Sequence, residues 1–312
     1  MYKDFFGLKE YPFGLTPDPK FVVFTPGNNE LLAGLYYGIE MAKGLIVLTG
    51  EVGTGKTTAL RWVIRRLDSS VSATYIFNPR LSIMDFYHKV TEMLEITSWT
   101  NKSDLLSKMG KTLEERHSLG LRTIIIVDEA HALSDDVLEE IRLLLNFESD
   151  NAKHLQIILS GQPELQTRLR QQNLRQLKQR VALRCSMPRL ESIDEVHRYI
   201  TERLKIAGSV SPNIFSREAI AFIFHCASGI PRIINNLCDN AMILAFSADT
   251  GLISRQMVES VAENLDMLPE RECLQGFASS KSHTSSDVLT HQGKEDLLNA
   301  SNRAEDIAFI KS

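Results

Sequence analysis

Short apolar runs alternate with helical patterns between Gly44 and about Met187. In chain order the runs read GLIVLT, SATYIF, RTIIIV, LQIILS and VALRCSM. They are continuously apolar, which is typical of strands buried on both faces of a sheet. Because a helical segment separates each run from the next, the pattern predicts a parallel five-stranded sheet covered by helices, a three-layer αβα domain.

After Pro188 only helical patterns remain. Ser192 to Glu195 is predicted to form a capping box that opens a helix ending at Gly208. A second helix is expected from a cap at Ser216 to a stop at Gly229, and Pro231 suits the first turn of a third. A fourth is expected to start near Ser254. These segments predict an all-helical lid.

The two ends of the chain differ from this pattern. Four prolines, Pro12, Pro17, Pro19 and Pro26, rule out a long helix near the start, so we expect an extended wrapping segment there, followed by a helix in NELLAGLYYGIEMA. Beyond about Met267 the sequence is too polar to bury a core. The predicted organisation is an extended segment with the start of a helix (1–43), an αβα nucleotide-binding domain (44–188), a helical lid (189–266) and a disordered tail (267–312).

Composition restricts the possible functions of the chain but does not identify one. The chain has 312 residues, 43% of them hydrophobic, and a net charge of −4, so any affinity for nucleic acid must come from a local basic patch. No apolar run has the length of a membrane span, and the first residues do not resemble a signal peptide. We therefore expect a cytoplasmic protein, with its four cysteines reduced.

The segment GEVGTGKTT fits the phosphate-binding pattern G-x-x-x-x-G-K-[ST], directly after a predicted strand and at the start of a helix. Backbone amides and a helix N-terminus at this place favour phosphate. Lys56 is expected to reach the β- and γ-phosphates of ATP, and Thr57 to hold Mg²⁺. The predicted nucleotide-binding residues of this loop are Gly50, Glu51, Val52, Gly53, Thr54, Gly55, Lys56, Thr57 and Thr58.

The segment TIIIVDEAHAL places two acids at the end of a buried strand. Asp128 is expected to join the magnesium shell, and Glu129 to polarise the attacking water. We interpret His131 as the residue that opens the next helix. The letters match the DEAH box of helicases, but a helicase requires a second RecA-like domain, and we see only a helical lid and a tail after the first sheet.

Four further polar residues are candidates for sensing nucleotide. Asn78 is expected to hydrogen-bond Glu129, although a simple Asn-Pro turn explains it equally well. In LQIILSGQPEL, either Ser160 or Gln162 is expected to contact the γ-phosphate or position water. Arg232, placed at a helix start by Pro231, suits a lid sensor of the γ-phosphate, with a surface arginine as the alternative.

The segment RLRQQNLRQLKQRVALR is basic and contains no acid. It fits an arginine finger that acts on a neighbouring subunit, a DNA-facing helix or a solvated basic face. Arg180 is the preferred finger because a guanidinium can neutralise charge on a γ-phosphate, and Arg175 is the second choice.

In this order the motifs resemble an AAA+ ATPase over roughly residues 1–266. More narrowly, FFGLKEYPFGLTPDPKF, TGEVGTGKTT, VDEAHAL, SGQPEL and GIPRIINNLCDNA resemble the general secretion pathway protein A (ExeA-like) group, which includes exopolysaccharide- and exosortase-associated ATPases and is related to transposition ATPases. The resemblance implies a central phosphate-loop strand and an N-terminal segment that borders the adenine. Asn28 stands where the group's histidine is expected, and no membrane span or peptidoglycan-binding region is seen.

The resemblance implies a Mg²⁺-dependent AAA+ ATPase that couples ATP binding and hydrolysis to assembly or regulation of a secretion or exopolysaccharide export system. It further implies a homo-oligomer with envelope machinery as partner, placed in the cytoplasm or at the inner membrane through those partners. The alternatives are an ATP-dependent DNA-binding regulator of the transposition type and a nucleotide switch with little turnover.

Overall fold

The computed structural model describes residues 2–77 and 81–268. Contacts within residues 1–268 define one compact unit, which holds both the sheet and the C-terminal helices. The tail predicted for 267–312 lies, apart from its first two residues, outside the described residues.

The five predicted strands are confirmed and form one parallel sheet in the order β2-β3-β4-β1-β5. Burial on both faces holds for the three internal strands, whereas β2 and β5 lie at the edges and are partly exposed. The bounds are Leu45–Thr49 (β1), Val71–Ile76 (β2), Arg122–Val127 (β3), Leu155–Gly161 (β4) and Val181–Ser186 (β5).

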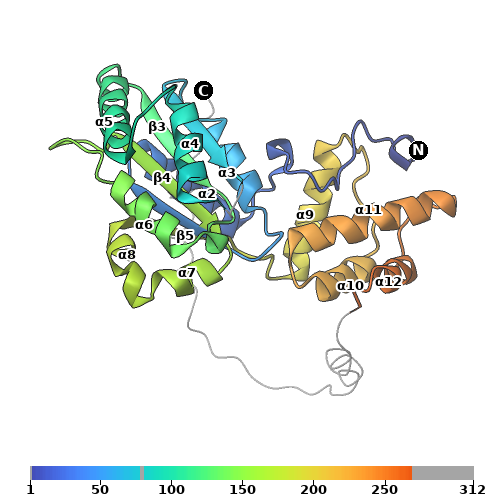
Figure 1. Cartoon of the computed structure of the whole chain (residues 1–312). Coiled ribbons are helices and arrows are strands. Elements are labelled where there is room, and N and C mark those ends of the chain that lie inside the picture. The colour runs from blue at the N-terminus through green and yellow to red at the C-terminus, as the bar shows by residue number, and fades with distance from the viewer. Residues whose placement is uncertain (1, 78–80, 269–312) are drawn as a thin grey trace, which may run out of the picture. The chain divides into compact units, whose positions relative to one another are not determined.

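Helices cover both faces of the sheet, which confirms the three-layer αβα prediction (Figure 1). Alternate residues of β1 enter different cores: Leu45 and Val47 pack on one face, and Ile46 and Leu48 on the other. The first core includes side chains of α4 (Ile83–Met93), α5 (Lys102–Ser118), α6 (Asp135–Leu144), α7 (Glu164–Leu169) and α8 (Arg175–Arg180). The second includes α2 (Pro26–Glu40) and α3 (Lys56–Ile64).

The strand register brings the chemical motifs to one edge of the sheet. Thr49 of β1 pairs with Gly161 of β4, and Val127 of β3 pairs with Leu159. Because parallel strands end on the same side, the loop after β1, the acids after β3 and the polar end of β4 are neighbours. Binding sites of open parallel sheets lie at this carboxyl edge.

Four helices form the lid, as predicted: α9 (Ile193–Ile206), α10 (Arg217–Ala227), α11 (Pro231–Ser247) and α12 (Arg255–Asn264). Ser192, Ser216 and Ser254 each cap a helix with the side-chain oxygen. The capping box predicted at Ser192 forms only in part, because the Ser192 oxygen accepts from the Glu195 backbone N–H but the return bond to the Ser192 backbone is replaced. The Glu195 carboxylate accepts a hydrogen bond from the backbone N–H of Glu191, one residue before the cap.

The N-terminal segment packs on the lid and contributes Tyr2, Leu8, Phe13 and Phe21 to its core. It is mainly irregular, with a four-residue helix α1 (Tyr2–Phe5) and a short 3-10 turn η1 (Pro19–Phe21) that the prolines did not predict. Arg203 of α9, 7% exposed, joins it by donating hydrogen bonds to the carbonyls of Pro12 (2.7 Å) and Phe21 (3.3 Å). The N-terminal segment is therefore anchored on the lid before α2 begins.

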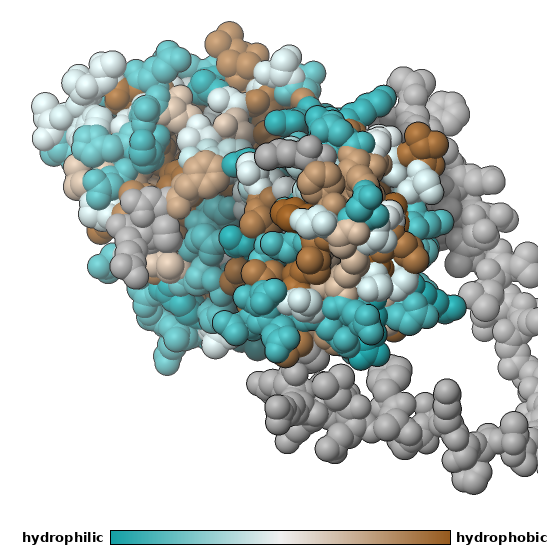
Figure 2. Space-filling view, turned by 90° about the vertical axis from the view of Figure 1, so that its right-hand side faces the viewer, coloured by the Kyte–Doolittle hydropathy of each residue, from teal (hydrophilic) through white to brown (hydrophobic). Residues whose placement is uncertain are grey.

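Hydrophobic and polar side chains are interspersed on the side of the molecule that carries the lid (Figure 2). Large exposed apolar residues of the lid and N-terminal segment include Phe5, Ile243 and Phe246, and the rings of Phe5 and Phe246 meet edge to face at 5.6 Å. Among residues 2–77 and 81–268, no helix is both long enough and apolar enough to cross a bilayer.

Candidate nucleotide-binding and active site

The loop after β1 has the backbone of a phosphate cradle. Gly53 and Gly55 have positive φ angles, 79° and 101°, which glycine adopts without steric cost. Gly55 is the N-cap of α3, so the helix begins at Lys56 with its N-terminus at the end of the loop. The N–H groups of the first turn of α3, which have no acceptor within the helix, and the positive end of the helix dipole lie together here, as an anion site requires.

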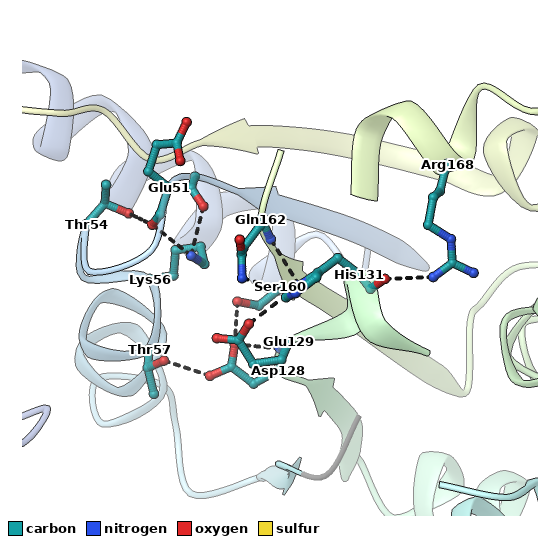
Figure 3. Close-up of polar contacts among 11 residues, drawn as sticks. Glu51, Thr54, Lys56, Thr57, Asp128, Glu129, His131, Ser160, Gln162 and Arg168 are labelled. Carbon is teal, nitrogen blue, oxygen red and sulfur yellow. Dashed lines mark hydrogen bonds and ion pairs between the residues drawn. The ribbon is translucent and has the colours of Figure 1, made fainter. Parts of the chain in front are cut away.

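Lys56 is buried, with 6% of its surface exposed, and lies against the loop. Its Nζ donates to the carbonyl oxygens of Gly50 (2.8 Å) and Glu51 (3.0 Å) (Figure 3). Burial lowers the pKa of Lys56, while the carboxylates of Glu129 and Asp128 act in the opposite direction. Within the described part of the chain, the hydrogen bonds of this ammonium go to two neutral carbonyls rather than to a carboxylate, so the site suits an added phosphate.

Asp128 is the centre of a buried hydrogen-bond cluster (Figure 3). The Thr57 hydroxyl donates to its Oδ2 at 2.6 Å, and the Ser160 hydroxyl donates to its Oδ1 at 2.7 Å. Carboxylate and hydroxyl oxygens are the hard ligands that Mg²⁺ prefers. The pair Thr57 and Asp128 therefore fits a magnesium ion that is also held by phosphate and water. Ser160 is bonded to Asp128, so Gln162 is the better candidate of the two for sensing nucleotide.

Glu129 has an unusual backbone, with φ 54° and ψ 33° in the left-handed region. A residue with a side chain populates this region at a cost of about 1–2 kcal/mol, and such strain is concentrated at functional sites. The turn directs Glu129 to the cavity that Lys56 also lines. Its side chain remains 46% exposed, as a group that must reach water requires.

His131 is the residue whose contacts sequence reasoning underestimated. It lies in a 3-10 turn, η2 (Ala130–Ala132), and does not open a longer helix. Its Nδ1 is 3.4 Å from Glu129 Oε2, and its Nε2 is 3.1 Å from Gln162 Nε2. The only hint in the sequence was that a histidine follows the acidic pair.

Arg168 supports the same turn from α7. It donates to the carbonyl oxygens of His131 (2.7 Å) and Leu133 (2.6 Å) and pairs with Asp135. It is therefore not part of a solvated basic face. Its role could not be read from the basic segment alone, because its partners lie more than thirty residues earlier in the chain.

A cavity of about 310 Å³ lies between the phosphate loop, the N-terminal segment and the start of α11. Apolar residues of the N-terminal segment and α2, such as Leu15, Val22 and Leu31, line it together with Arg203 and Arg232. The Arg232 backbone N–H donates to the Gly53 carbonyl at 3.1 Å, so the lid contacts the loop directly. Asn28 also lines the cavity and donates to the Val23 carbonyl at 3.1 Å.

Of the predicted residues, Gly50, Glu51, Asp128 and Gln162 are not among those that line this cavity, and neither are Arg180 and Arg175. Arg180 is half-buried and donates to Asn146 Oδ1 at 2.7 Å, with Glu148 3.9 Å away. Arg175 is exposed at the first turn of α8. Neither lines the cavity of its own chain, so a catalytic role for either remains a prediction that concerns a neighbouring subunit. Asn78 lies outside the described residues.

The parallel sheet, the glycine-lined loop, the acidic pair and the helical lid define a P-loop NTPase of the AAA+ class. The family model described as "AAA domain" matches residues 39–169. The chain is 41% identical over 252 residues to General secretion pathway protein A of Aeromonas hydrophila, covering 79% of this chain and 45% of that protein. Within the AAA+ class, the chain belongs with the ExeA-like proteins, although it spans less than half the length of this relative.

Solved structures at lower identity share the fold. Cdc6p from Pyrobaculum aerophilum has a TM-score of 0.65 at 16% identity, covering 85% of this chain and 73% of that chain. The ORC1 protein of Aeropyrum pernix in complex with DNA has a TM-score of 0.62 at 18% identity, covering 82% and 69%. The Thermotoga maritima RuvB branch migration motor has a TM-score of 0.55 at 16% identity, covering 86% and 80%.

Proposed function

We propose that this chain is a Mg²⁺-dependent ATP hydrolase. The observation that carries the proposal is that Lys56 and Glu129 line one cavity, with Thr57 and Asp128 joined beside them. One group binds phosphate, one carboxylate is placed to activate water, and two oxygens suit Mg²⁺. The apolar lining from the N-terminal segment suits the adenine ring.

Each residue has a distinct role in this proposal. Lys56 and the backbone N–H groups of the loop hold the phosphates. Asp128 and Thr57 hold Mg²⁺, which when bound neutralises charge that develops on the phosphate oxygens. Glu129 accepts a proton from the attacking water as a general base. Gln162 and Arg232 contact the γ-phosphate from the sheet and from the lid.

The substitution Glu129→Gln tests this proposal. It keeps the size of the side chain but removes the base, so hydrolysis should fall by about two to four orders of magnitude. ATP binding, measured by fluorescence with a labelled nucleotide, should stay within twofold. Asp136→Asn, at an exposed acid of α6, is the control and should leave both unchanged.

A single-turnover hydrolysis assay distinguishes an active ATPase from a nucleotide switch with little turnover. The wild-type chain should convert bound ATP to ADP within seconds to minutes. A wild-type rate as low as that of Glu129→Gln would favour the nucleotide switch, and a normal rate in the variant would show that Glu129 is not the base.

We also propose that hydrolysis regulates assembly of an envelope secretion or polysaccharide export system, through contacts with its proteins at the inner membrane. The support is the 41% identity to General secretion pathway protein A. Cells in which Glu129→Gln replaces the wild-type chain should lose export while retaining the protein at normal level. Normal export in those cells would contradict this role. The DNA-binding alternative can draw on fewer residues of the basic segment, because Arg168 and Arg180 contact groups of their own chain.

A further inference from the structure

His131 lies between the candidate base and the candidate phosphate sensor (Figure 3). Its Nδ1 lies 3.4 Å from both Glu129 Oε2 and the Gln162 backbone nitrogen, and its Nε2 lies 3.1 Å from Gln162 Nε2. The side chain is 19% exposed, so few water molecules can replace these partners. A single imidazole therefore connects the end of β3 to the end of β4.

The chemistry of a neutral imidazole makes the two contacts dependent on each other. One ring nitrogen carries the proton and donates, and the other accepts. The Gln162 amide nitrogen is a donor, so its contact requires Nε2 to accept and Nδ1 to carry the proton. In this tautomer the proton is on Nδ1, which lies 3.4 Å from Glu129 Oε2, within ion-pair distance of that carboxylate.

The opposite tautomer breaks the connection to Glu129. Its unprotonated Nδ1 accepts from the Gln162 backbone N–H, which lies 3.4 Å away. The orientation of the Gln162 amide therefore decides whether the ring presents a protonated Nδ1 to Glu129.

The turn that carries His131 is held firmly. Arg168 donates to the carbonyls of His131 and Leu133, as described above. A Cβ atom added at Gly161 would lie 3.1 Å from the His131 backbone nitrogen, so the turn packs closely on the end of β4. The His131 ring and the Gln162 amide can therefore rotate, whereas the backbone of the turn is held in place.

We propose that His131 is a positioning residue that couples the Gln162 amide to the Glu129 carboxylate. It orients Glu129 for attack on water only when Gln162 presents its amide nitrogen to the ring. The inference rests on the proposed function, in which Glu129 is the base. It extends that function, because neither the phosphate loop nor the acidic pair requires a histidine at this place.

Substitutions of His131 test the coupling. His131→Ala should lower kcat about tenfold, while the Kd for ATP and the Tm stay within twofold and about 2 °C of wild type. The side chain of Asn places an amide donor near the position of Nδ1, whereas Gln reaches the position of Nε2. His131→Asn should therefore retain more activity than His131→Gln. A purely structural role would not give this order.

A double substitution tests the connection to Gln162. If both residues act through one chain of hydrogen bonds, His131→Ala with Gln162→Ala should lower kcat by less than the product of the single effects. His197→Ala, at an exposed histidine of α9, is the control and should match wild type.

Three outcomes would overturn the inference: an unchanged kcat in His131→Ala, a loss explained by a weaker Kd, or equal activity of the Asn and Gln variants. Glu129→Gln is assayed beside them. Normal hydrolysis in that variant would refute the assignment of the base itself, whereas an inactive Glu129→Gln with a normal His131→Ala would refute only the coupling.

Discussion

The Thr57 hydroxyl donates a hydrogen bond of 2.6 Å to the Asp128 carboxylate, joining two motifs that lie 71 residues apart. The bond fixes the first turn of α3 against the end of β3. It also brings two oxygen ligands to one point beside the phosphate loop. The proposed dependence of the site on magnesium therefore rests on this pair.

Removing the Thr57 hydroxyl should uncouple ATP affinity from magnesium. Thr57→Val keeps the shape of the side chain but loses the oxygen, so the gain in affinity on adding Mg²⁺ should fall about tenfold or more. Thr57→Ser retains the oxygen and serves as the control. Titration of labelled ATP with and without Mg²⁺ measures both. An undiminished magnesium effect in Thr57→Val would contradict the assignment.

The lowered pKa of Lys56 predicts a pH limit for ATP binding. Below this pKa the side chain is an ammonium and attracts phosphate; as the pH rises through it, the charge is lost. Because burial places the pKa below the usual 10.5, affinity should begin to decline at a lower pH than an exposed lysine would give. Lys56→Arg stays charged throughout this range. Any affinity that this variant retains should not vary with alkaline pH, and a parallel decline in both proteins would exclude Lys56 as the cause.

Gly53 should be irreplaceable for a reason that goes beyond its backbone angle. Its φ is +79°, and an added Cβ would lie 2.6 Å from the Cβ of Arg232, displacing the start of α11. Gly120 is a matched control, since its φ is +75° but nothing lies within 4 Å of an added Cβ.

Both glycine variants should lose about 1–2 kcal/mol of unfolding free energy from backbone strain. Only Gly53→Ala should also weaken ATP binding and slow hydrolysis. Equal ATP affinities in the two variants would show that contact between the loop and the lid is not needed for binding.

Arg203 should matter for stability more than its neighbour Arg198. Its guanidinium donates to two carbonyls of the N-terminal segment and lies 4.8 Å from the centre of the Phe21 ring. Arg203→Met should destabilise the chain by about 2–4 kcal/mol, because buried carbonyls lose their donors. Arg198 is exposed on the same helix, and Arg198→Met should cost less than about 0.5 kcal/mol. Denaturant unfolding measures both, and similar losses would refute the anchoring role.

If Arg180 acts on a neighbouring subunit, hydrolysis should depend on assembly. The specific activity of the wild-type chain should then rise with protein concentration, and Arg180→Ala should lower kcat by about three orders of magnitude with ATP affinity kept. Arg175→Ala tests the second candidate for the arginine finger in the same way. A specific activity that does not change with concentration would count against a residue supplied in trans.

The strands and lid helices were predictable because their signals are local. Continuous apolar runs mark two-sided burial, and Ser192, Ser216 and Ser254 mark helix starts by the chemistry of capping. The short helix Tyr2–Phe5 was missed because the contacts that stabilise it lie elsewhere, including the Tyr2 hydroxyl bonded to Asp239 of α11. At Ser192 the capping residues were recognised, but the backbone partner of Glu195 depended on the path of the preceding loop.

The sequence by itself determined the phosphate loop and the acidic pair, because the spacing of Gly50, Lys56 and Thr57 and the position of Asp128 after a buried strand are local features with a direct chemical meaning. Only the tertiary structure decided what surrounds them. It assigned Ser160 to Asp128, placed His131 between Glu129 and Gln162, and turned Arg168 from a basic surface residue into a support of that turn. These roles depend on which strands become neighbours in the sheet, and the order β3-β4-β1 is set by packing across the whole domain.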